Sequence, residues 1–132
     1  MGFVYSQGRA RDGKIFFYEK GGGVIKWNTS GMGTFEQDPQ GGPSILKKRP
    51  SISLYHELGH AWDNMAGLMA GDSMKFQDLE VNEWTATRTE NMIRQELGIP
   101  LRTWYYKSKS GGPMFPRLLD RNGNYKYTQY QH

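Results

Sequence analysis

The sequence predicts an α+β fold, with residues 1–132 forming one domain. Three observations support this class: aromatic and β-branched runs separated by glycine near the N-terminus, a helical pattern over about residues 51–65, and a second helical pattern that ends near residue 97. A length of 132 residues is usual for a single domain, and 14% aromatic residues are too many for a disordered segment. We therefore expect a compact domain in which a short N-terminal antiparallel hairpin or sheet packs on two helices, followed by a loop-rich C-terminal tail.

Three runs near the N-terminus predict short strands. They cover residues 3–5, 14–19 and 24–28, and each contains β-branched or aromatic residues. Glycines at positions 21–23 separate the second and third runs, and glycine adopts the positive φ of tight turns without strain. We therefore expect the second and third strands to pair in an antiparallel hairpin. Residues 29–50 are rich in Gly, Pro, Ser and Lys, which predicts a surface loop.

Two helices are expected after this loop. Pro50 is typical of a helix start and Gly67 of a helix stop, so the first helix should run from residue 51 or 53 to residue 65. The second should begin at residue 73 or 78 and end at residue 97, because Gly98 follows. In the tail, Asn122-Gly123 indicates a turn within a late hairpin.

Composition excludes several kinds of function. The chain has no cysteine, which excludes disulfides, thiolate metal ligands and cysteine nucleophiles. No run of about 18 apolar residues is present and the N-terminus lacks the apolar stretch of a signal peptide, so we expect no membrane partner. The 17 Lys and Arg residues against 13 Asp and Glu residues give a net charge of +4, an excess too small to indicate a nucleic-acid partner.

The first predicted helix contains the segment SLYHELGHAWDN, with two of the three histidines of the chain. His56 and His60 are four residues apart, so on a helix both imidazoles project from one face and can bind one metal ion. In zinc peptidases, the residue that follows the first histidine reaches the water activated by the metal and acts as its general base. This position is held by Glu57, so the segment predicts a zinc site. Gly59 should allow another backbone or a substrate to approach the helix closely.

A catalytic zinc site usually has three protein ligands, so a third ligand is required. The metzincin pattern would need glycine at 63 and histidine or aspartate at 66, but the chain has Asp63 and Ala66. His132 is the terminal residue, which is a poor position for a ligand. An acidic residue from the second helix remains, as in gluzincins. Its candidates, in order of preference, are Glu83, Glu90 and Glu80.

Spacings of three and seven residues should place these three glutamates near one inward face of the second helix, together with small and apolar residues. Glu83 is preferred because the segment NEWTA resembles gluzincin ligand helices and because the small Ala86 leaves room for a metal. Each glutamate also has a purely structural interpretation, such as an ion pair between Glu90 and Arg94. Asp63 is expected either to hydrogen-bond a histidine or to be solvated.

Three stretches resemble the NleD-like effector metallopeptidases, whose relatives include C-terminal domains of polymorphic toxins. They are GGGVIKWN (residues 21–28), RPSISLYHELGHA (residues 49–61) and RTENMIRQELGIPLRTWY (residues 88–105). The resemblance implies a zincin-like fold in which His56 and His60 bind Zn²⁺, Glu57 is the base and a downstream glutamate completes the site. The tail after residue 106 has no counterpart in the family.

The resemblance further implies a secreted effector or toxin domain that is delivered into a host or rival cell and cleaves a protein in its cytoplasm. A cognate immunity protein or inhibitor is a further conceivable partner, and we expect a monomer. In zincins a Tyr, His or Arg often hydrogen-bonds the oxyanion, a role open here to Tyr105, Tyr106 or Arg102. Their alternative interpretation is aromatic packing on the core with the arginine at the surface. Residues 24–27 could pair with an extended substrate or form a plain hairpin.

Two other functions fit parts of the sequence. A zinc amidase that acts on cell wall would use the same ligands, because these do not determine which amide bond is cut. A non-catalytic basic module would instead use Lys47, Lys48 and Arg49 with nearby aromatic residues to bind nucleic acid or an acidic partner.

Overall fold

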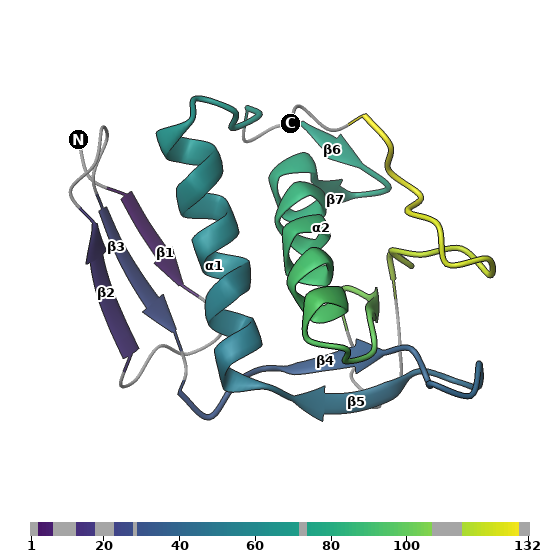
Figure 1. The fold of residues 1–132 in the computed structure, drawn as a ribbon. Coiled ribbons are helices and arrows are strands. Elements are labelled where there is room, and N and C mark those ends of the chain that lie inside the picture. Colours follow the sequence, from purple (N-terminus) through teal and green to yellow (C-terminus); the bar gives the residue numbers. More distant parts are fainter. Residues whose placement is uncertain are drawn as a thin grey trace.

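A computed structural model describes residues 3–6, 13–17, 23–27, 29–71, 74–106 and 115–129. In the first three of these segments, only the backbone and the side chain of Ile25 are described. The fold is α+β, as predicted. Two helices of similar length, α1 (Pro50–Met65) and α2 (Val81–Glu96), pack side by side, and strands lie beside α1 and across one end of the helix pair (Figure 1). None of the helices among these residues is long and apolar enough to cross a membrane.

The N-terminal sheet packs on α1, on the side away from α2 (Figure 1). It consists of β1 (Phe3–Ser6), β2 (Gly13–Phe17) and β3 (Gly23–Trp27), with β3 in the centre. The antiparallel pairing of β2 with β3 confirms the predicted hairpin, whereas β1 pairs with β3 in parallel. Because both edges of β3 are occupied, residues 24–27 follow the hairpin alternative, and the alternative in which they pair with a substrate is wrong. Two of the three turn glycines, Gly21 and Gly22, lie outside the described residues.

The loop predicted for residues 29–50 is partly wrong, because two strands form there. Strand β4 (Gly33–Glu36) is the centre of a second sheet, between β5 (Ile45–Lys48) and β8 (Arg102–Trp104). The central place of β4 in the sheet could not be predicted from its sequence, because glutamate and glycine are disfavoured in a buried strand. Glu36 is nevertheless 1% exposed, since two arginines bind its carboxylate. Strand β5 is exposed throughout and lies at the edge of the sheet.

The first helix has the predicted limits, with Gly67 at φ +74° just after its end. The second ends as predicted before Gly98, at φ +69°, but it begins later than expected. A short hairpin of β6 (Lys75–Phe76) and β7 (Leu79–Glu80) precedes it and turns through two residues with positive φ. The polar turn between these short strands resembled a helix N-terminus in the sequence, which explains the wrong start.

The core lies between the first half of α2 and the C-terminal segment. Trp84 is fully buried and packs with Phe76 and Tyr127, whose rings lie 5.3 and 6.0 Å from its own. The tail therefore folds back over the helix. Its predicted turn is confirmed by Gly123, at φ +81°, where the backbone N–H donates to the carbonyl of Asp120. The cluster of buried residues comprises Ala70, Leu79, Val81, Trp84, Leu118, Leu119 and Tyr127.

Candidate metal centre

The two helices approach each other closely at Gly59. A Cβ at this position would lie 3.3 Å from the Cβ of Thr89 and 3.6 Å from the Cα of Ala86, both on α2. The expectation that Gly59 permits a close approach is therefore confirmed, and the partner is α2. The contact brings carboxylates of α2 within reach of imidazoles on α1.

His56, His60 and Glu83 meet at this contact. The same oxygen of Glu83, Oε1, lies 3.0 Å from Nε2 of His56 and 2.8 Å from Nε2 of His60. The three ligand atoms lie within 4.8 Å of one another, and they form a group that could hold a metal ion. Two imidazole nitrogens and a carboxylate are typical zinc donors, so the residues present fit the metal. Both histidines are buried, at 2% and 7% exposure.

The other two candidate glutamates lie elsewhere. Glu80 is exposed and belongs to β7, where it pairs with Lys75, because the helix begins only at Val81. Its predicted place on the inward helix face is therefore wrong. Leu97, one of the apolar residues that the same spacing placed on that face, is 59% exposed. Glu90 does face inward, but Oε1 lies 3.0 Å from Nδ1 of His56, on the side of the ring away from Glu83.

The alternative in which Glu90 forms an ion pair with Arg94 is confirmed. The Nε–H of Arg94 donates to Oε2 of Glu90 at 2.8 Å, as the i,i+4 spacing predicted. This ion pair is buried rather than exposed, since both side chains are 1% exposed. Arg102 is also buried and donates to Glu90 and to the carbonyl of Tyr105. The expectation that Arg102 lies at the surface is wrong, and its guanidinium is committed to these partners.

Glu57 is buried next to the cluster, at 4% exposure, but is not part of it. Burial raises the pKa of its carboxyl above the ordinary value, although the charges of His56 and His60 act against this rise. A carboxyl group with a raised pKa accepts a proton more readily near neutral pH, as a general base must.

The charges of the cluster support one another. Burial lowers the pKa of His56, but hydrogen bonds to Glu83 and Glu90 and the charges of both carboxylates outweigh burial and raise it to about 9. Burial raises the pKa of Glu83, but the hydrogen bonds to His56 and His60 hold it well below the usual range. Without a metal, His56 is therefore protonated at neutral pH, and its positive charge lies between the carboxylates of Glu83 and Glu90.

Tyr105 borders the cluster. Its ring lies 6.4 Å from that of His56, and the Cζ of Arg102 lies 4.6 Å above its centre. Burial, the charge of Glu83 and a hydrogen bond to Glu83 raise the pKa of its hydroxyl well above the usual range, so the hydroxyl stays protonated. Tyr106 is 47% exposed and packs its ring edgewise on Tyr105 at 4.7 Å.

Asp63 on α1 connects the two helices through Thr85 on α2. It is 2% exposed and its Oδ2 accepts a hydrogen bond from the hydroxyl of Thr85 at 3.2 Å. The expectation of a solvated aspartate is therefore wrong. His132, the third histidine of the chain, lies outside the described residues.

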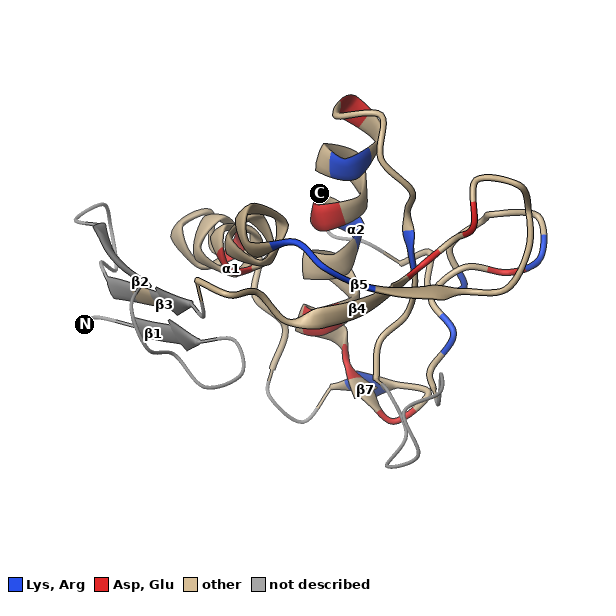
Figure 2. Cartoon of the chain, turned by 90° about the horizontal axis from the view of Figure 1, so that it is seen from below, with Lys and Arg blue, Asp and Glu red and all other residues tan. Residues whose placement is uncertain are grey.

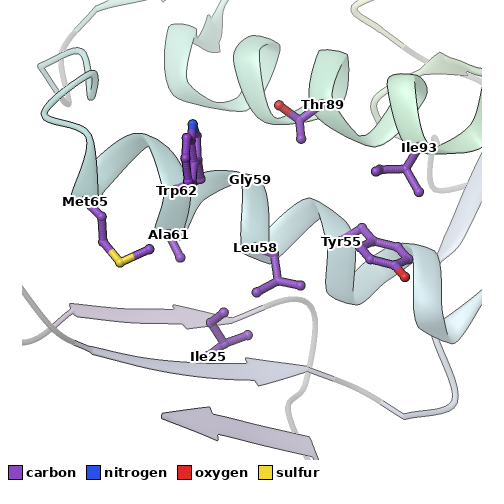
Figure 3. Close-up of a pocket in the computed structure, with 9 residues that line it drawn as sticks. All are labelled: Ile25, Tyr55, Leu58, Gly59, Ala61, Trp62, Met65, Thr89 and Ile93. Carbon is purple, nitrogen blue, oxygen red and sulfur yellow. The ribbon is translucent and has the colours of Figure 1, made fainter. Parts of the chain in front are cut away.

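Among the described residues, the pockets that the structure shows are not lined by His56, His60 or Glu83. An apolar pocket of about 330 Å³ lies between α1, α2 and β3 and is lined by Tyr55, Leu58, Trp62 and their neighbours (Figure 3). Basic and acidic residues are scattered along the described chain, apart from a basic run at the end of β5 that leads into α1 (Figure 2). Lys47 and Lys48 are exposed on β5, but Arg49 binds Glu36. The chemistry is therefore concentrated at the contact of the two helices.

Sequence reasoning missed the buried polar network behind the cluster. Arg94 donates to Glu36 at 2.7 Å and to the hydroxyl of Thr34 at 2.9 Å, both on β4. The i,i+4 spacing of Glu90 and Arg94 was the only signal, and the same spacing occurs in most exposed helical ion pairs.

Comparison with known proteins connects this geometry to a family. The model of the M91 peptidase family, described as effector proteins, matches residues 4–88. This segment contains both histidines, Glu57 and Glu83, and ends before Glu90. Searches of the curated proteins and of the solved structures gave no match. Because the family model covers more than half of the chain, the protein belongs to this family of effector peptidases.

Proposed function

We propose that the protein is a zinc-dependent metalloendopeptidase, a secreted effector or toxin domain that cleaves a protein in the cytoplasm of a target cell. The convergence of His56 Nε2, His60 Nε2 and Glu83 Oε1 on one small volume carries this proposal. Membership in a peptidase family supports the reaction class.

Each residue of the site has a distinct role. The two histidines and Glu83 hold the zinc ion, which when bound supplies Lewis-acid polarisation of the attacking water and the scissile carbonyl. Glu57 takes the proton from the attacking water and later passes it to the leaving amine. Its burial beside the ligands, without being one of them, suits this role.

Tyr105 is the candidate for oxyanion stabilisation. Its hydroxyl stays protonated, because burial and the charge of Glu83 raise its pKa well above the usual range. A donor held at that position can hydrogen-bond the oxygen that gains negative charge when water attacks a carbonyl. Tyr106 lies against the outer side of Tyr105 and is more exposed, which suits contact with the substrate rather than with the oxyanion.

The rival functions have less support. A zinc amidase would use the same ligands, but the family match is to peptidases. A basic binding module has less support, because Arg49 is paired with Glu36 and only two of its three basic residues, Lys47 and Lys48, are exposed on β5. The proposal implies a protein substrate as partner and, if the protein is a toxin, a cognate immunity protein. We propose that the chain acts as a monomer.

The proposal is tested by zinc content and proteolysis together. Purified protein should contain about one zinc per chain and cleave proteins of a target-cell lysate. Glu57→Gln should retain the metal and lose cleavage, whereas His60→Ala should lose both. Glu80→Gln is the matched control, because Glu80 is exposed and outside the cluster, and it should retain both. Full proteolysis by Glu57→Gln, or a chain without zinc that still cleaves, would refute the mechanism.

A further inference from the structure

The two ring nitrogens of His56 have different partners, and only one of them faces the proposed metal. Nε2 points to Glu83, while Nδ1 lies 3.0 Å from Oε1 of Glu90. A neutral imidazole carries one hydrogen, so a metal at Nε2 requires the hydrogen to be on Nδ1. A carboxylate can only accept a hydrogen bond, and it therefore favours this tautomer.

Three contacts fix the carboxylate of Glu90 in the orientation that accepts a hydrogen bond from Nδ1 of His56. Its Oε1 also accepts from Nη1 of Arg102 at 3.0 Å, and its Oε2 accepts from Nε of Arg94 at 2.8 Å. The carboxylate is 1% exposed, so water does not compete for these contacts. Two positive partners from α2 and β8 hold both oxygens and keep the group from turning toward the metal.

The arginine behind Glu90 is itself anchored. Arg94 binds Glu36 and Thr34 on β4 and donates to the carbonyl of Pro100 at 3.1 Å. The orientation of Glu90 is thereby set by the second sheet as well as by its own helix. Burying this many charges is unfavourable unless all are paired, and here each carboxylate has two arginine partners.

We propose that Glu90 is a positioning residue that fixes the His56 ring and its Nδ1–H tautomer, so that Nε2 is presented to the zinc ion. This inference rests on the proposed metal site. Glu90, Arg94 and Arg102 all lie beyond residue 88, where the family match ends, so the match assigns them no role. A partner of this kind typically changes metal affinity by about 10- to 100-fold.

The zinc affinity of matched variants tests the inference. Glu90→Gln removes the charge that faces Nδ1, whereas Glu36→Gln makes the same change at another carboxylate that is 1% exposed and held by two arginines, without a contact to His56. The zinc dissociation constant is measured by competition with a chelator of known affinity. Glu90→Gln should weaken zinc binding by about 10- to 100-fold, and Glu36→Gln, which reaches Glu90 only through Arg94, should weaken it less. Equal losses in both variants, or no loss in Glu90→Gln, would overturn the inference.

A measurement on the unmodified chain does not depend on the folding of any variant. In the zinc-loaded protein, nitrogen–proton nuclear magnetic resonance of the imidazoles should show the His56 hydrogen on Nδ1 and the metal on Nε2. A hydrogen on Nε2 would overturn the inference, even in a chain that still binds zinc. An unmodified chain that binds no zinc would overturn the proposed function, and the inference with it.

Discussion

Arg94→Met should destabilise the zinc-free protein by about 3–5 kcal/mol, the usual cost of breaking a buried ion pair. The arginine is 1% exposed and binds two carboxylates, Glu36 and Glu90, at 2.7 and 2.8 Å. Methionine fills similar space but leaves both carboxylates buried with fewer partners. With a urea dependence of about 2 kcal/mol per M for a small domain, the midpoint of unfolding should fall by about 2 M.

Arg49→Met is the matched control, because Arg49 binds the same carboxylate of Glu36 at 2.6 Å but is 31% exposed. Solvent screens this pair, so its loss should cost about 1 kcal/mol or less. Both variants are unfolded in urea without zinc and followed by circular dichroism. Equal losses, or a larger loss for Arg49→Met, would refute the reasoning that burial makes Arg94 the stronger contact.

Three further predictions concern the site itself. Tyr105→Phe should lower kcat by about 100-fold with little change in KM, since the oxyanion contact forms only in the transition state; an unchanged kcat in a peptide-cleavage assay would exclude this role. Because the pKa of His56 is about 9, zinc binding at pH 7 should release about one proton from this ring, which calorimetry in buffers of different ionisation enthalpy detects; no proton release would contradict the protonated state. The raised pKa of His56 stabilises the folded chain fully below pH 6.5, and this stabilisation is lost as the pH rises through about 9. The lowered pKa values of Glu83 and Glu90 stabilise the folded chain above pH 4.5, and this stabilisation is lost in acid. The melting temperature of the zinc-free chain should therefore be highest between about pH 4.5 and 6.5, and a maximum at alkaline pH would contradict this.

The local part of the site could be predicted from the sequence. A spacing of four residues places His56 and His60 on one face wherever that segment is helical, and the limits of α1 follow from Pro50 and Gly67. Glu83 could be chosen as the third ligand from its distance along the chain and the small residue one turn later. These inferences need only helical periodicity.

Helical periodicity could not show which of Glu83 and Glu90 faces the metal-binding nitrogens of the histidines. The two glutamates are seven residues apart and face the same helix, so periodicity places both near the histidines. What separates them is Arg102, which comes from β8 and binds Glu90. That contact depends on the second sheet, whose central strand was predicted to be a loop.

Strand β4 was not predicted because its burial depends on polar contacts rather than on apolar packing. Thr34 and Glu36 are 5% and 1% exposed, and both accept hydrogen bonds from Arg94, which lies about 60 residues away in the sequence. A pattern of apolar residues cannot indicate a strand whose burial depends on a distant arginine. Glu80 was misplaced for a related reason, since the hairpin before α2 delays the start of the helix.

Crystals grown with zinc test the central claim most directly, through an anomalous difference map recorded at the zinc absorption edge. We predict one strong peak between α1 and α2, about 2.0–2.2 Å from Nε2 of His56, Nε2 of His60 and a carboxylate oxygen of Glu83. A peak bound by Glu90 in place of Glu83, or no peak within reach of both histidines, would contradict the account.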